Sequence, residues 1–350
     1  MERTEYAKAQ RGGLRERGRI SLMRQSICGE IRTSVLGFGC GSVLGRVGRG
    51  ISLRAMGTAW DEGITLFDTA RSYGYGGAEA VLGEFLRGKR EQAIVATKFG
   101  ITPQRQSALK RLVVPLARAA VHVPGVRGLR RSRGSREMTL GQFTVAGLRE
   151  SLETSLRELH TDHIDVLFLH EATSSAMRQQ ELMAELDVLV QAGKVLRVGL
   201  YAGADVIAEG MTNGPATLTA MQFGGNYSDP AVAGFTQQNP RGLFLIANHP
   251  FGGEQRVACT KAVLAAMSTD ETVPAELRDK LRGADWQAVL EVILGVILDG
   301  TGTHVLVFSM MGQDHLRANA RAIESCRFNS ADLALIRRRL LSSSSLMAGE

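Results

Sequence analysis

The sequence predicts an α/β protein in which eight parallel strands close into a single-domain (β/α)8 TIM barrel. Eight short apolar segments alternate with segments of helical periodicity, an order that implies parallel pairing through crossovers. No GxGxxG nucleotide fingerprint follows the first strand, which favours a barrel over a doubly wound sheet. The length of 350 residues is also common for one such barrel.

Apolar segments bounded by glycine and polar residues place the strands, and apolar residues at helical spacing place the helices. The expected strands are 35–38, 65–68, 93–98, 165–170, 195–200, 218–223, 243–247 and 303–308. The expected helices are 53–62, 76–87, 144–159, 181–191, 286–298 and 314–323.

The remaining segments define the domain organisation. Residues 1–20 are expected to form a flexible basic tail, and residues 21–350 form the barrel domain. The barrel domain begins with a small hairpin within 23–35. It also contains long loops after strands three and seven, which are the basic insert 101–140 and the loop 251–285.

The net charge of +7 is concentrated in two segments. Residues 1–20 hold six basic and three acidic residues, and residues 101–136 hold nine basic residues and no acid, so the rest of the chain is acidic. Solvated arms are the simplest interpretation. A loop that closes over an anionic substrate is a second interpretation, and contact with an anionic membrane surface is a weaker third. The sequence shows no specific nucleic-acid recognition motif.

Composition indicates a protein of the cytoplasm. No apolar segment approaches the roughly 20 residues of a membrane span, and the basic N-terminal segment lacks the apolar core of a signal peptide. The four cysteines are far apart and match no zinc spacing, which is typical of a reducing compartment.

Three of the expected strands end on an ionisable residue. These residues are Asp68, Lys98 and His170, and a glycine-rich loop after Asp68 adds Tyr73 and Tyr75. Taken singly, Asp68 is equally compatible with a turn cap and His170 with a buried core histidine. Spacing alone does not distinguish the two tyrosines. Because the active sites of such barrels lie at the carboxyl ends of the strands, the residues together predict a catalytic site.

The chemistry of these groups suits reduction of a carbonyl. A phenol has a reference pKa near 10, and we expect the ammonium group of Lys98 to lower the pKa of a neighbouring tyrosine. Asp68 would keep the ammonium charged and fixed, and His170 would orient a carbonyl oxygen. Such a set can donate a proton to a carbonyl that receives a hydride.

The stretch DEGITLFDTARSYGYGGAEAVLGEFLRGKREQAIVATKFG closely resembles the aldo/keto reductase superfamily, and the similarity extends from about residue 35 to residue 320. The resemblance implies an eight-fold barrel that uses NAD(P)H without a Rossmann domain. It implies a tetrad of Asp68, Tyr73, Lys98 and His170, in which the spacing from the aspartate selects Tyr73 as the general acid.

The same resemblance places part of a nicotinamide site. Gln222 matches the glutamine that holds the nicotinamide amide. Tyr201 and Ala202 stand where the family usually has Ser-Asn, and Asn248 stands where it commonly has a stacking aromatic residue. Tyr201 is the neighbouring ring that would replace this stacking.

Residues for the remainder of the cofactor follow strand eight. Ser309 replaces the usual glycine, and Asn319 matches an asparagine expected near the adenine. His315 stands where many relatives carry an arginine for the 2′-phosphate, and Arg317 is a candidate to compensate. The resemblance implies NADP or NAD, with NADP slightly favoured, and these substitutions weaken the preference for NADP.

These observations together predict an NAD(P)H-dependent oxidoreductase that interconverts a small carbonyl substrate, aldehyde or ketone, and its alcohol. Monomers are expected by resemblance, and the basic insert adds the hypothesis of an anionic substrate. Two alternatives remain open at this stage. One is a cofactor-binding regulatory subunit without activity, and the other is a non-redox barrel enzyme such as a lyase or epimerase.

Overall fold

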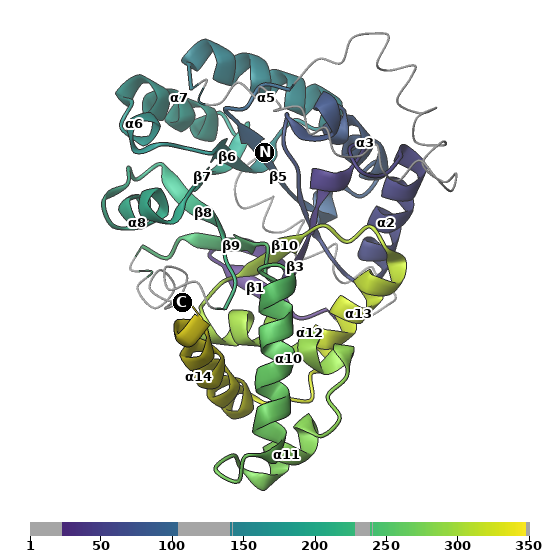
Figure 1. Ribbon diagram of the computed structural model, residues 1–350. Helices are drawn as coiled ribbons and strands as arrows, with labels where there is room; N and C mark the ends of the chain where they lie inside the picture. Colours follow the sequence, from purple (N-terminus) through teal and green to yellow (C-terminus); the bar gives the residue numbers. More distant parts are fainter. Residues whose placement is uncertain (1–22, 104–140, 142, 228–238, 240, 348–350) are drawn as a thin grey trace, which may run out of the picture.

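The computed structural model describes residues 23–103, 141, 143–227, 239 and 241–347. Eight parallel strands form a closed barrel in the order β10-β3-β4-β5-β6-β7-β8-β9 (Figure 1). The strands are β3 (Leu36–Gly39), β4 (Leu66–Asp68), β5 (Ile94–Phe99), β6 (Ile164–His170), β7 (Val195–Tyr201), β8 (Leu218–Gly224), β9 (Phe244–Asn248) and β10 (Val305–Phe308). All eight overlap the segments expected from the sequence, which confirms the barrel.

Helices surround the barrel, as expected for strands that need cover on both faces. Every residue of β5 and of β6 is buried, so these apolar segments belong inside a closed structure. The helices are α2 (Arg49–Asp61), α3 (Ala78–Phe85), α5 (Val145–Leu159), α6 (Ser174–Met177), α7 (Gln180–Gln191), α8 (Ala204–Asn213), α10 (Glu254–Thr269), α11 (Ala275–Leu281), α12 (Trp286–Gly300), α13 (Gln313–Glu324) and α14 (Ser330–Met347).

The barrel interior holds its own apolar cluster, which is separate from the larger core between strands and helices. Leu66, Ile94, Val166 and Phe168 are among its members and are almost fully buried. The two-stranded antiparallel sheet of β1 (Gln25–Cys28) and β2 (Ile31–Ser34) precedes the barrel, and Cys28 and Ile31 join the same cluster. The small hairpin predicted at the N-terminal side of the barrel is therefore confirmed.

The segment 251–285, expected as a loop, folds instead as α10 and α11. The helical pattern of α10 was not recognised in the sequence, because its buried face includes Cys259 and Thr260 beside Val263 and Leu264. This mixture weakens the contrast between an apolar and a polar face. Helices α8 and α14 were likewise not expected from the sequence. The basic tail 1–20 and residues 104–140 of the basic insert 101–140 lie outside the described residues.

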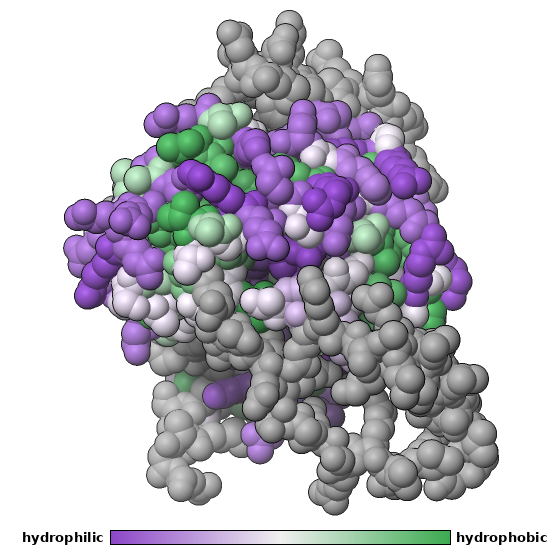
Figure 2. All heavy atoms as spheres, turned by 90° about the horizontal axis from the view of Figure 1, so that it is seen from above, coloured by the Kyte–Doolittle hydropathy of each residue, from purple (hydrophilic) through white to green (hydrophobic). Residues whose placement is uncertain are grey.

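Figure 2 shows hydrophilic residues over most of the coloured surface, with apolar atoms in small areas between them. The large exposed apolar side chains of the described surface lie on separate elements: Ile27, Ile51, Tyr75, Val188 and Trp286. Within the described helices, none combines the length and the apolar composition of a membrane span.

Candidate active site

A buried ion pair joins the ends of two adjacent strands. Asp68 is the last residue of β4, and Lys98 lies near the end of β5, which pairs with β4 in parallel. The Lys98 Nζ donates to Asp68 Oδ1 at 2.6 Å and to the backbone oxygen of Thr69 at 2.9 Å. Only 1% of Lys98 is exposed. Asp68 therefore holds the ammonium group of Lys98, as predicted.

Tyr73, and not Tyr75, faces this ion pair. The Nζ of Lys98 lies 5.2 Å from the centroid of the Tyr73 ring. His170, the last residue of β6, meets the same ring edge-on, at 86° and 6.0 Å between centroids. Tyr75 is 38% exposed and adopts a left-handed backbone with φ +58°. The four residues of the predicted tetrad thus come together at the carboxyl end of the barrel.

The predicted direction of the Tyr73 pKa shift is wrong. The pKa of Tyr73 is raised well above its usual value, first by burial and then by the Asp68 carboxylate. The Lys98 ammonium group does not reverse this, because it is paired at 2.6 Å with the same carboxylate. Tyr73 consequently keeps its proton through the neutral range and is available as a proton donor.

His170 is uncharged at neutral pH. Burial, followed by the charge of Lys98, lowers its pKa to about 3. The Tyr201 ring lies 5.4 Å from the His170 ring between centroids, and Lys98 Nζ lies 5.9 Å from the Tyr201 centroid. The imidazole therefore lies between two phenols and can serve as a neutral hydrogen-bonding group for a polar substrate atom.

Two of the predicted nicotinamide residues lie on neighbouring strands in register. Tyr201 on β7 pairs with Gln222 on β8, and the next strand, β9, ends on Asn248. Burial raises the pKa of Tyr201, while the side chain of Asn248 acts to lower it. Gln222 is fully buried, and neither its side-chain oxygen nor its nitrogen has a partner within the described part of the chain. A buried amide without partners is uncommon and unfavourable. The carboxamide of a nicotinamide offers the donor and the acceptor that this amide lacks, so the residues fit the cofactor.

The other predicted cofactor residues follow β10. Ser309 Oγ donates to the backbone oxygen of Gly39 at 3.2 Å, which joins the ends of β10 and β3. On α13, His315 is exposed and Asn319 is 6% exposed. Arg317 is half-exposed and lies 3.7 Å from Glu62, so it is only loosely engaged with this carboxylate.

Backbone strain is concentrated at the same end of the barrel. Five non-glycine residues of the described chain have a positive φ, and four of them follow the ends of strands: Leu44, Tyr75, Glu171 and His249. Such conformations are unfavourable for residues with a Cβ and often occur at functional sites. The carboxyl-end loops therefore carry a cost in stability that the rest of the barrel must offset.

The sequence analysis did not identify two buried groups beside the tetrad. Cys40 follows β3 and is fully buried, and burial together with Asp68 raises the pKa of its thiol. Glu79 in the first turn of α3 is also fully buried and accepts a hydrogen bond from Thr97 Oγ1 at 2.6 Å. An acidic residue among the small and apolar residues of the buried face of α3 was the signal for Glu79.

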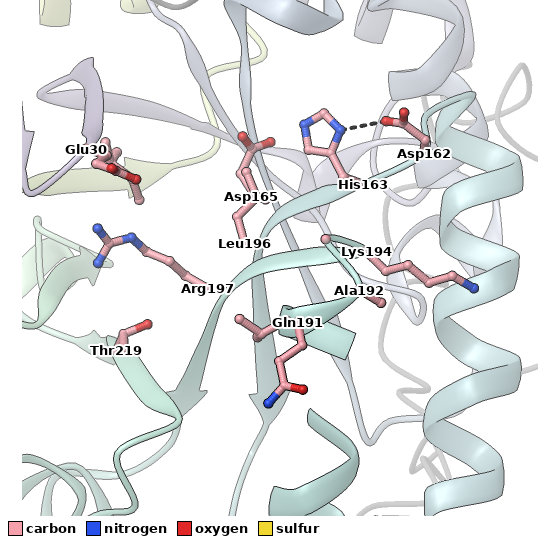
Figure 3. Close-up of a pocket in the computed structure, with 13 residues that line it drawn as sticks. Glu30, Asp162, His163, Asp165, Gln191, Ala192, Lys194, Leu196, Arg197 and Thr219 are labelled. Carbon is pink, nitrogen blue, oxygen red and sulfur yellow. Dashed lines mark hydrogen bonds and ion pairs between the residues drawn. The ribbon is translucent and has the colours of Figure 1, made fainter. Parts of the chain in front are cut away.

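A cavity of about 960 Å³ lies away from the tetrad, at the amino end of β6 and β7 (Figure 3). Its lining includes Asp165, which accepts from Val95 N at 2.9 Å and pairs with Arg90 at 2.7 Å. In Figure 3, the guanidinium group of Arg197 extends toward Glu30 of the hairpin. None of the predicted site residues lines this cavity.

Comparison with known proteins agrees with this geometry. A sequence model of the aldo/keto reductase family matches residues 35–231. "Probable aldo-keto reductase 1" of Glycine max is 29% identical over 196 residues, which cover 54% of this chain and 48% of that protein. "D-threo-aldose 1-dehydrogenase" of Pseudomonas sp. is 35% identical over 143 residues, which cover 39% of each chain. The chain thus spans about half or less of these curated relatives.

The fold has counterparts among solved structures. Aldo-keto reductase AKR11C1 from Bacillus halodurans, in its holo form, superposes with a TM-score of 0.64 at 20% identity, over 91% of this chain and 95% of that chain. At this identity the likeness concerns the fold. The family match covers more than half of the 350 residues. The chain therefore belongs to the aldo/keto reductase family.

Proposed function

We propose that this protein is an NAD(P)H-dependent oxidoreductase that reduces an aldehyde or ketone to an alcohol, with Tyr73 as general acid. The observation that carries the proposal is the position of the Tyr73 ring, 5.2 Å from the Lys98 Nζ and 6.0 Å from the His170 ring. Family membership and the reductase and dehydrogenase names of the relatives support the same reaction class.

When bound, NAD(P)H would supply the hydride for the carbonyl carbon. The protein supplies the proton. As the carbon–oxygen double bond becomes a single bond, the oxygen takes the proton of the Tyr73 hydroxyl, and the alcohol leaves the site. The charge left on the phenolate is stabilised by the Lys98 ammonium. His170, neutral because its pKa is lowered to about 3, holds the carbonyl oxygen through a hydrogen bond.

The raised pKa of Tyr73 favours reduction over oxidation at neutral pH. Alcohol oxidation needs a phenolate that accepts a proton, and burial together with Asp68 disfavours this ionised form. We therefore propose carbonyl reduction as the working direction.

For the cofactor, Gln222 would pair with the nicotinamide carboxamide while Tyr201, beside Asn248, would flank the ring. Ser309 and Asn319 would line the path toward the adenosine. His315 and Arg317, both on α13, are the groups proposed to favour NADP over NAD, since both side chains carry nitrogens that can donate hydrogen bonds to the expected 2′-phosphate. The four free cysteines suit work in the reducing cytoplasm.

The test has two steps. Fluorescence titration with NADPH and with NADH measures which cofactor binds, and a carbonyl panel with the preferred cofactor then measures turnover. The panel includes an aldose, because one relative carries that name, and a matched pair of neutral and carboxylated aldehydes. Turnover by the full chain is expected. Tight cofactor binding without turnover on any carbonyl would contradict the proposal and favour a regulatory protein.

A further inference from the structure

The loop that carries Tyr73 is tied to the strand that carries Lys98 through one buried carboxylate. Glu79 accepts from Thr97 Oγ1 at 2.6 Å through one oxygen and from Arg71 Nη1 through the other. Thr97 precedes Lys98 on β5, and Arg71 lies two residues before Tyr73 in the loop. Both Glu79 and Thr97 are fully buried. A single side chain therefore joins the two elements that must face each other in the site.

The Arg71 side chain has a second anchor. Its Nη1 also donates to Glu158 Oε2 of α5 at 2.9 Å. The side chain of Arg71 is 12% exposed, and Glu79 is the largest favourable influence that raises the pKa of the guanidinium group. Charged hydrogen bonds in such buried surroundings are stronger than bonds between neutral groups. Arg71 is thus held by two carboxylates from two helices.

The loop has few internal means to hold Tyr73 in place. The hydroxyl oxygens of Thr69 and Ser72 are buried, and in the described chain neither has a hydrogen-bond partner. At the start of the loop, Lys98 Nζ fixes the backbone oxygen of Thr69. Beyond this point Tyr73 itself packs against the core and its amide donates to the backbone oxygen of Ala70, and Arg71 adds the ionic side-chain restraint. The hydrogen bonds of Glu79 therefore tether the loop that carries Tyr73 to β5.

We propose that Glu79 is a positioning residue for the reaction, whose buried carboxylate sets the placement of Tyr73 relative to Lys98 and His170. The inference rests on the proposed function and deepens it, because Glu79 acts on Tyr73 only through Arg71 and on Lys98 only through Thr97. Misplacement of a reacting group by about 1 Å lowers a rate by about a hundred-fold. A change at Glu79 should consequently lower kcat without weakening cofactor binding.

The experiment compares Glu79→Gln with Glu84→Gln in the full chain. Glu84 lies on the same helix, and its carboxylate pairs with Arg49 at the surface, so it controls for loss of a charge from α3. Glu79→Gln should lower kcat by about ten- to a hundred-fold, with the NADPH dissociation constant within about two-fold of the unchanged protein. Hydrogen exchange in residues 69–77 should accelerate. Glu84→Gln should change neither.

Thr97→Val and Thr97→Ser test the same link with a smaller change. The valine has the same shape without the hydroxyl group, and the serine restores that group. We expect Thr97→Val to lower kcat and Thr97→Ser to recover most of it, even if Glu79→Gln does not fold. Unchanged kcat in folded Thr97→Val, or in Glu79→Gln with only a lower Tm, would overturn the proposal.

The exchange measurement separates this inference from the proposed function. If the unchanged protein reduces no carbonyl, the proposed function fails, and exchange in residues 69–77 still decides whether Glu79 holds the loop. If turnover is present and exchange in this loop is the same in Glu79→Gln and Glu84→Gln, the positioning role is wrong while the proposed function stands.

Discussion

The two ends of the barrel handle buried charge in different ways. At the amino end, the Asp165 carboxylate accepts from the Val95 amide and pairs with Arg90, which also donates to the backbone oxygens of Ala93 and His163. At the carboxyl end, the ion pair of Asp68 and Lys98 lies beside aromatic rings, and the buried Gln222 amide has no partner in the described chain. At the amino end the charged groups pair within the protein. At the carboxyl end polar groups remain available to a ligand.

This contrast shows that cavity size alone does not locate the active site. The cavity of about 960 Å³ at the amino end is lined in part by Asp165, whose carboxylate is already used within the fold. The carboxyl end combines strain, a raised phenol pKa and an unpaired amide, all of which reduce stability before a ligand binds. Burial also raises the pKa of Asp165 to about 8, so the features that distinguish the carboxyl end are the strained loops and the unpaired Gln222 amide of the described chain.

The largest effect should follow loss of the ammonium group at the carboxyl end. Lys98→Met leaves the Asp68 carboxylate buried without its partner, which should lower the free energy of unfolding by about 3–5 kcal/mol. Urea denaturation measures this loss. Turnover should disappear as well, because the phenolate of Tyr73 loses its stabilising charge.

Loss of the corresponding cation at the amino end should lower the stability of the protein without affecting catalysis. Arg90→Met removes the cation beside Asp165 and should also lower the free energy of unfolding, by about 1–3 kcal/mol, because burial raises the pKa of Asp165 to about 8 and the carboxyl group is then largely protonated at neutral pH. In protein that remains folded, kcat and the cofactor dissociation constant should be unchanged. A matched loss of kcat in Arg90→Met would contradict the division of roles between the two ends.

A smaller effect is expected from substitution of Gln222, which should raise the free energy of unfolding and not lower it. Gln222→Met keeps the shape and removes two buried polar atoms that have no partner, so the free energy of unfolding should rise by about 1 kcal/mol. The same variant should bind NADPH about ten-fold more weakly, because the hydrogen bonds to the carboxamide are lost. Denaturation and fluorescence titration of one preparation measure both effects. A destabilised variant with unchanged cofactor affinity would show that the amide serves the fold.

The smallest effect should be the response of reduction to pH. His170 has a pKa lowered to about 3 and Tyr73 a pKa raised well above 10.0, so neither changes charge near neutrality. We expect kcat/KM for reduction to be nearly constant from about pH 5 to about pH 9. The stability contributed by keeping His170 neutral is present above the unfolded value of 6.5 and is lost as the pH falls toward 3. An acidic limb in kcat/KM centred near 6.5 would mean that His170 titrates normally.

The barrel and the placement of the tetrad were predictable from the sequence, because strand ends are local and parallel strands bring their carboxyl ends together. An apolar segment ends at or near each of three residues, Asp68, Lys98 and His170, so the hydrophobic pattern was enough to place them at strand ends. Helices α10 and α11 were missed because small and polar residues share the buried face of α10 with apolar ones. The buried faces of these helices are determined by packing in the folded protein, and the segments themselves show little contrast between apolar and polar positions.

The electrostatics of the site depended on three-dimensional detail. Sequence reasoning expected the pair of Asp68 and Lys98 together with a lower pKa for the neighbouring phenol, whereas burial and the Asp68 carboxylate raise the pKa of Tyr73. The role of Glu79 in joining the Tyr73 loop to β5 was also invisible, because Arg71 and Thr97 lie eight positions before it and eighteen after it. Such links exist only once the chain is folded.

The central claim is that Tyr73 donates the proton in carbonyl reduction, and Tyr73→Phe tests it most directly. We measure kcat with the best carbonyl substrate beside the NADPH dissociation constant of the same preparation. The account predicts a kcat lower by about 10²- to 10⁴-fold with cofactor affinity nearly unchanged. A Tyr73→Phe protein that keeps its kcat would contradict the account.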